Sequence, residues 1–114
     1  MRPRACQCDH CRMQGARYLS DPNGCVEVRA DNPDAFIRYQ FGMKTADFLS
    51  CKRCGVLVGS VCSTEHGPRM VINANLFLDI ETADTMATDS SDEILDERNA
   101  RREAAWTPVE LIYR

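Results

Sequence analysis

Three cysteines within six residues constrain this chain more than any other feature. Cys6, Cys8 and Cys11 form a C-x-C-x-x-C motif near the start of the 114-residue sequence. A thiol cluster this dense is not typical of hydrophobic packing, and thiolates are soft ligands that suit zinc. Three protein ligands leave the fourth position of a tetrahedral zinc open. The motif therefore predicts a zinc site of the catalytic kind rather than a closed structural site.

A second motif, C-x-x-C-G, is formed by Cys51, Cys54 and Gly55. It has the shape of a zinc knuckle, in which two thiolates bind one metal across a tight turn and the glycine permits a left-handed backbone. The motif supplies only half of a tetrahedral site. Either the two cysteine clusters share one zinc, or another residue completes the knuckle.

Several further residues are candidates for a role in metal binding or catalysis. Cys25, Cys62 and His66 are candidates for completing the knuckle. Cys25 and Cys62 belong to predicted strands and are therefore interpreted as small buried residues. His66 belongs to a predicted turn and is interpreted as a solvated residue. Asp9 and His10, inside the first cluster, are interpreted as ordinary loop residues. A thioredoxin-like redox pair is disfavoured, because a predicted strand rather than a helix follows the second motif.

The composition excludes several classes of function. The net charge is −3, and no block rich in lysine, arginine and aromatic residues indicates nucleic-acid binding. No apolar run approaches the roughly 20 residues of a membrane span, and the first residues contain no apolar signal region. We therefore expect a cytoplasmic protein with no membrane or nucleic-acid partner. Because that compartment is reducing, seven closely spaced cysteines indicate metal ligands rather than disulfides.

Short strands separated by turns predict a mainly β domain. Alternating or clustered apolar residues mark five strand segments, which are residues 25–29, 36–41, 56–62, 69–75 and 109–113. The closely spaced turns between the first four favour antiparallel pairing. Ser90 and Glu93 fit a capping box at the start of one C-terminal helix, which we expect to end near Ala105. Residues 79–97 are acidic and are interpreted mostly as a solvated loop.

The two cysteine motifs and their separation resemble those of the glutathione-dependent formaldehyde-activating (GFA) family, which includes the centromere protein V domain. Residues 6–12, followed by Gly15 and Ala16, resemble its C-x-C-x-x-C-R…G-A stretch, and residues 48–55 resemble its F-x-x-C-x-x-C-G motif. Residues 71–76 are similar to its V-x-N-x-N-x-L strand. Residues 100–108 are similar to the A-R-R-x-x-x-W-T-P ending of one bacterial branch. The resemblance covers nearly the whole chain, which is interpreted as one domain, residues 1–114.

The resemblance implies a fold of coiled antiparallel β-sheets like that of the Rab accessory protein Mss-four. It also implies two zinc sites: a catalytic one at Cys6, Cys8 and Cys11, and a structural one to which Cys51 and Cys54 contribute half. In the family, the other half comes from a C-x-C on an N-terminal strand, whereas only five residues precede Cys6 here. We therefore expect that strand to be missing, and a homodimer to cover the sheet edge that its absence leaves.

For function, the resemblance implies a zinc-dependent carbon–sulfur lyase. Its partner would be a small-molecule thiol or aldehyde adduct, such as a glutathione–aldehyde adduct of the S-hydroxymethylglutathione type. The alternative is a non-catalytic binding module in which zinc stabilises a small β domain. An open fourth position at the first cluster would favour the enzyme, and a fourth protein ligand would favour the module.

Overall fold

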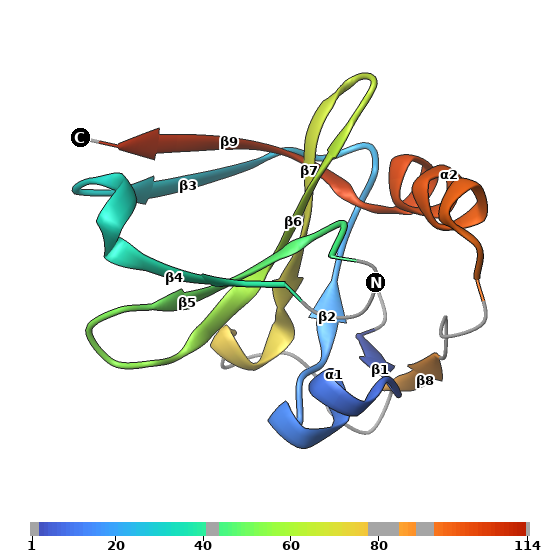
Figure 1. Ribbon diagram of the computed structural model, residues 1–114, viewed down its shortest axis with the longest axis horizontal. Coiled ribbons are helices and arrows are strands. Elements are labelled where there is room, and N and C mark those ends of the chain that lie inside the picture. The colour runs from blue at the N-terminus through green and yellow to red at the C-terminus, as the bar shows by residue number, and fades with distance from the viewer. Residues whose placement is uncertain (1–2, 41–43, 78–84, 89–92, 114) are drawn as a thin grey trace.

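The structure, a computed structural model, describes residues 3–40, 44–77, 85–88 and 93–113. These residues form a mainly β fold with one C-terminal helix, which confirms the predicted fold class (Figure 1). Two short 3₁₀ turns lie at Pro33–Ala35 and Ala74–Leu76. The other elements are, in order, β1 (Arg4–Cys6), α1 (Asp9–Gln14), β2 (Tyr18–Leu19), β3 (Val26–Ala30), β4 (Phe36–Tyr39), β5 (Asp47–Cys51), β6 (Leu57–Thr64), β7 (Gly67–Asn73), β8 (Met86–Thr88), α2 (Leu95–Ala105) and β9 (Thr107–Tyr113).

The strands form an open sheet in which most neighbours are antiparallel. The order along the sheet is β4–β5–β6–β7–β2–β1–β8, and β9 pairs with both β7 and β3. Two pairs are parallel, β1 with β8 and β3 with β9. Figure 1 shows β3 beside β9, and α1, β1 and β8 gathered at one end of the molecule. The parallel pairs join segments far apart in the sequence, so the pattern of short turns does not reveal them.

All five predicted strand segments are strands in the structure, but their ends differ. The predicted capping box is wrong in register: Ser90 lies outside the described residues, and α2 begins after Ile94. The backbone N–H of Ile94 donates to Glu97 Oε1 at 3.2 Å, because Glu97 lies three residues further on and reaches back. Glu93 instead accepts a hydrogen bond from Arg101 Nε at 2.9 Å. The acidic segment is not loop throughout, since it contributes β8 and the first turn of α2.

A second helix, α1, occupies residues of the first cysteine motif, where the sequence predicts a loop. It begins after Cys8, whose sulfur accepts a hydrogen bond from the Cys11 backbone N–H at 3.5 Å. It ends at Gly15, which adopts the left-handed conformation with φ of 65°. A helix of six residues is too short to produce a recognisable apolar period. Because α1 begins after Cys8, Cys8 and Cys11 lie on the same helical turn.

The hydrophobic core connects the first cysteine motif to the centre of the sheet. Leu49 on β5 and Met70 on β7 are fully buried. Cys11, Tyr18 and Trp106 belong to one buried cluster with residues of β6 and β7, and Cys6 and Cys8 pack against its edge. The first motif is therefore held by the same packing that stabilises the domain.

A buried arginine of α2 contacts the end of its own helix and the segment before β5. The guanidinium of Arg102 lies 4.9 Å from the centre of the Trp106 ring, and its Nη1 donates to Thr45 Oγ1 at 2.6 Å. Such a cation–π contact stabilises a charge that burial would otherwise penalise. Within the described ranges, no helix is long and apolar enough to cross a membrane.

Candidate metal centre

The sulfur atoms of Cys6, Cys8 and Cys11 converge where β1 leads into α1. All three lie within 4.8 Å of one another. In a tetrahedral zinc site, Zn–S bonds of about 2.3 Å place the sulfurs about 3.8 Å apart, so a small inward movement of the thiols reaches that geometry. The three predicted residues thus form a group, here called the triad, that could hold a metal ion.

One side of the triad is buried and the other is accessible. Cys11 is 3% exposed, whereas Cys6 and Cys8 are half-buried. Among the residues that the structure describes, no fourth Cys, His, Asp or Glu joins the group. The described chain therefore supplies three ligands, and a metal ion there could be approached from the side of Cys6 and Cys8.

The three thiols differ in their pKa values. A hydrogen bond from the Cys11 thiol is the main reason that the pKa of Cys6 is lowered to about 5. Donating that bond, together with burial, holds the pKa of Cys11 far above its usual range, and burial also raises the pKa of Cys8. One thiolate beside two neutral thiols is thus the favoured charge state without a cation. A divalent cation would offset the repulsion between three thiolates, and its binding would release the remaining protons.

Tyr18 is a partner of the triad that the sequence pattern does not reveal. Its hydroxyl lies 3.2 Å from Cys11 Sγ. Burial is the main reason that the pKa of Tyr18 lies well above its usual range, so the hydroxyl stays protonated and can donate to a thiolate. Tyr18 is on β2, which pairs with β1 through Arg4. The pairing of two strands therefore positions a donor beside a candidate ligand, as is typical around metal sites.

Asp9 and His10 are near the triad in sequence but do not join it. Asp9 is exposed and forms an ion pair with Arg12 at 3.7 Å, so it is a surface residue as expected, but it begins α1 rather than lying in a loop. His10 is only half-exposed, and its ring centre lies 5.0 Å from that of Tyr39 and 4.6 Å from that of Phe48. The prediction of an ordinary loop residue is therefore wrong for His10, because α1 directs it against the aromatic side chains of β4 and β5.

Cys51 ends β5, Cys54 lies in the turn that leads to β6, and neither is part of the triad. Gly55 has φ of 78°, as predicted, and its N–H donates to the Cys51 carbonyl at 2.7 Å. Backbone N–H groups of Cys54 and Arg53 hydrogen-bond to the Cys51 sulfur and lower its pKa. Figure 1 shows this turn well away from α1. The idea that both clusters share one zinc therefore has no support in the geometry.

None of the three residues considered for completing the knuckle joins it. Cys62 is buried in the core, which confirms its interpretation as a small buried residue. Cys25 is exposed and precedes β3, so the same interpretation is wrong for Cys25, because the strand begins one residue later. His66 is exposed in the β6–β7 turn and forms an ion pair with Glu103 of α2.

The pair of His66 and Glu103 predicts a pH-dependent contribution to stability. The hydrogen bond and negative charge of Glu103 raise the pKa of His66 above its ordinary value of 6.5. The contribution is therefore fully present below about pH 6.5 and is lost as the pH rises through the folded-state pKa. We expect His66→Gln to lower the melting temperature at about pH 5.5 but not at about pH 8.5. A pH-independent difference would contradict this assignment.

Comparison with known proteins supports the fold but no activity. No model of a known protein family matches the chain, and no curated protein matches it either. The crystal structure of a Rhodobacter sphaeroides protein, a Northeast Structural Genomics target, is similar with a TM-score of 0.52. The alignment covers 75% of this chain and 80% of that protein at 20% sequence identity. At that identity the likeness shows a shared fold alone, and the resemblance to the GFA family stays a prediction.

Proposed function

We propose that this chain is a GFA-like zinc protein that acts as a carbon–sulfur lyase on a glutathione–aldehyde adduct. The observation that carries the proposal is the convergence of three thiols with no fourth protein ligand among the described residues. This is the ligand set expected of a zinc site that keeps a position for a substrate. The resemblance of both cysteine motifs to the GFA family supplies the substrate class.

The reaction would be the reversible addition of a thiol to an aldehyde. The carbon–sulfur bond forms or breaks, and the proton of the thiol moves to or from the former carbonyl oxygen. When bound, zinc would supply Lewis acidity and lower the pKa of a thiol in the open position. Cys6, Cys8 and Cys11 would be the metal ligands, and Tyr18 would orient Cys11. Asp9 and His10 have no assigned proton-transfer role, because one is ion-paired at the surface and the other is packed against aromatic rings.

Exchange NMR with formaldehyde and glutathione tests the lyase proposal. We expect the zinc-loaded protein to accelerate interconversion between free glutathione and its hydroxymethyl adduct, and Cys8→Ser to remove the acceleration. Cys25→Ser is the matched control, since Cys25 is exposed and outside both clusters. Zinc-loaded protein that gives no acceleration beyond the same amount of free zinc would refute the lyase assignment while leaving metal binding intact.

The second candidate, a zinc-stabilised binding module, is favoured by the burial of Cys11 within the core cluster. A metal at the triad would then fix α1 and β1 to the sheet, and its binding free energy would add to folding stability. Removal of zinc by a chelator distinguishes the two candidates. For the module, the loss of thermal stability is the only effect, whereas for the enzyme the acceleration of adduct exchange is lost as well.

A further inference from the structure

The triad draws its ligands from two segments that are anchored separately in the fold. Cys6 ends β1, whereas Cys8 and Cys11 belong to α1 and its N-cap. A metal ion fixes the distances among all three sulfurs, so its affinity depends on how firmly the two segments are held relative to one another. Residues that join the two segments can therefore act on metal binding without contacting the metal.

The segment that carries Cys6 lies at the edge of the sheet. β1 meets β2 at one residue pair, Arg4 with Tyr18, and the Arg4 side chain hydrogen-bonds to Ser20. On its other side β1 pairs with β8, where Cys6 lies opposite Thr88. Among the described strands, β8 has no partner besides β1. Such a short pair of strands needs further contacts to keep one position.

The side chain of Arg17 joins this edge of the sheet to the end of α1. Its Nη1 donates to Thr85 Oγ1 at 3.2 Å, one residue before β8 begins. Its Nε donates to Asn75 Oδ1 at 2.8 Å, and Asn75 Nδ2 donates to the carbonyl of Gly15, the C-cap of α1, at 3.3 Å. One guanidinium thus connects the strand beside β1 with the helix that supplies the other two ligands.

The 3₁₀ turn after β7 anchors these contacts in the sheet. The N–H of Ala74 donates to the Arg17 carbonyl at 2.6 Å, and the N–H of Asn75 donates to Asn73 Oδ1 at 3.0 Å. Asn73 is buried at the end of β7, and its Nδ2 donates to the Leu57 carbonyl of β6 at 2.9 Å. Figure 1 shows this turn, in yellow, beside β2. A continuous series of hydrogen bonds therefore runs from the centre of the sheet to Arg17.

We propose that Arg17 is a positioning residue for the triad. By fixing β8, and through it β1, against the end of α1, it holds the sulfur of Cys6 in place relative to the two sulfurs of α1. Because the ligands are gathered before the metal binds, less conformational freedom is lost on binding, which raises the affinity. The inference rests on the proposed zinc site at the triad and does not require the lyase activity.

The geometry of these contacts requires an arginine at position 17. A guanidinium is planar and presents its N–H groups in fixed directions, so that Nε and Nη1 reach two acceptors at once. A lysine ammonium is a compact charge on a flexible stem and does not reproduce this fork. Arg17→Lys therefore keeps the positive charge but breaks the connection between Asn75 and Thr85.

Competition for zinc with a chromophoric chelator, on the full chain in reducing buffer, tests the role of Arg17. We expect Arg17→Lys to weaken zinc binding at the triad by about tenfold. Cys8→Ser, which lacks a ligand, measures any binding that does not come from the triad. Arg29→Lys is the matched control and should bind zinc like the wild type.

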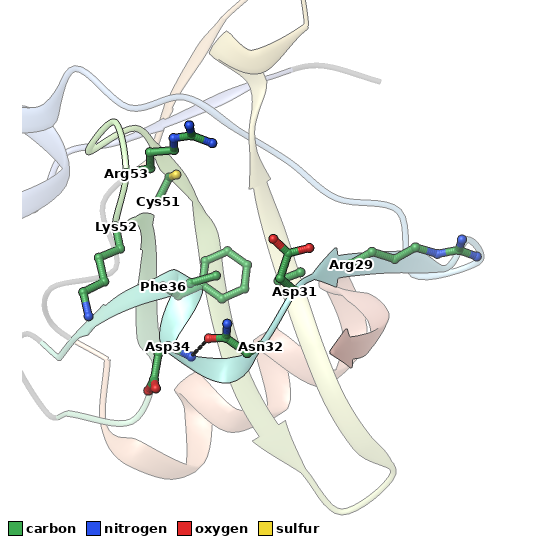
Figure 2. Close-up of a pocket in the computed structure, with 10 residues that line it drawn as sticks. Arg29, Asp31, Asn32, Asp34, Phe36, Cys51, Lys52 and Arg53 are labelled. Atoms are coloured by element: carbon green, nitrogen blue, oxygen red, sulfur yellow. Dashed lines mark hydrogen bonds between the residues drawn. The ribbon is translucent and has the colours of Figure 1, made fainter. Parts of the chain in front are cut away.

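The control is suitable because Arg29 is distant from the elements of the triad. It lies on β3 and forms an ion pair with Glu27 of the same strand at 2.8 Å. Figure 2 shows its guanidinium directed away from the other residues labelled there. Arg29→Lys therefore makes the same chemical change without altering a contact to α1, β1 or β8.

Two variants of Thr85 separate positioning from a general loss of stability. Thr85→Val keeps the shape of the side chain but removes the acceptor for Arg17, whereas Thr85→Ser keeps an acceptor hydroxyl. We expect Thr85→Val to lose zinc affinity as Arg17→Lys does, and Thr85→Ser to retain it. Cobalt in place of zinc reports the ligand geometry, and its d–d bands should shift in Arg17→Lys and Thr85→Val but not in Thr85→Ser. A merely structural role would lower the melting temperature without moving these bands.

The positioning role and the zinc site fail separately. Zinc affinity and cobalt bands that stay unchanged in Arg17→Lys and Thr85→Val would overturn the positioning role alone. An equal loss in Thr85→Ser and Thr85→Val would overturn it too, because the hydroxyl would then not be responsible. Equal zinc binding by the wild type and Cys8→Ser would instead overturn the proposed zinc site, and this inference with it.

Discussion

Cys8→Ser is expected to abolish zinc binding at the triad while leaving the domain folded. A serine hydroxyl is a poor zinc ligand at neutral pH compared with a thiolate, so the affinity should fall by more than about a hundredfold. The local structure should survive, because Cys8 is the N-cap of α1 and its sulfur accepts a hydrogen bond from Cys11 N–H. Serine is among the preferred N-cap residues. Competition with a chromophoric chelator measures the affinity, and circular dichroism checks the fold.

Cys8 is a better choice for this test than Cys11. Cys11 is buried in the core and contacts Tyr18, so its replacement would mix loss of a ligand with loss of packing. Cys25→Ser makes the same chemical change at an exposed position outside both clusters and should bind zinc like the wild type. If Cys8→Ser kept its affinity for zinc at the triad, the ligand assignment would be wrong.

Gly59→Ala is expected to destabilise the domain by about 3 kcal/mol. Gly59 lies on β6 opposite Ile72 of β7. A Cβ atom there would lie 2.2 Å from the carbonyl oxygen of Val71 and 2.7 Å from Cε of Met70. The methionine end can move, but the carbonyl belongs to the strand ladder at the centre of the sheet. The strands would have to separate locally, which weakens hydrogen bonds as well as packing. Urea-induced unfolding measures the loss.

Gly24→Ala is the control for the close approach at Gly59. At Gly24 the nearest atom to a new Cβ is the Asp21 carbonyl oxygen at 3.5 Å, an ordinary contact distance. Its effect should stay within about 1 kcal/mol, and reduced freedom of the unfolded chain can make it stabilising. Equal losses for the two variants would indicate that the distance between β6 and β7 does not limit the side chain at position 59.

Apolar alternation and apolar runs predict β3, β4, β6, β7 and β9, because the pattern of burial is visible within each of these strands, but they did not reveal β1, β2, β5 or β8. β6 and β7 lie where the apolar runs before Cys62 and after Arg69 indicate strands. The triad is equally local. Cys6, Cys8 and Cys11 are so close in sequence that almost any compact turn brings their sulfurs together. The left-handed Gly55 after Cys54 follows from the same short-range geometry.

Longer-range features did not follow from the pattern. With six residues, α1 is too short for an apolar period to be recognised, and its direction turns His10 against Phe48 rather than toward solvent. The N-cap of α2 is Ile94 rather than the predicted Ser90, because the Glu97 side chain reaches back to the Ile94 backbone N–H. Glu93 pairs with Arg101 instead. The packing of His10 depends on aromatic residues distant in the sequence. The cap of α2 depends on which of two glutamates binds the helix start, and residue type alone does not distinguish them.

The sequence by itself determined the mainly β character, the C-terminal helix and the residues of the triad, because alternation, helix period and cysteine spacing act over a few residues. Only the tertiary structure decided that β1 pairs with β8 and β3 with β9, that Tyr18 faces Cys11, and that Cys51 and Cys54 lie apart from the triad. Each of these depends on which strands pair and on what the core buries, and both are settled by the packing of the whole chain rather than by any single segment.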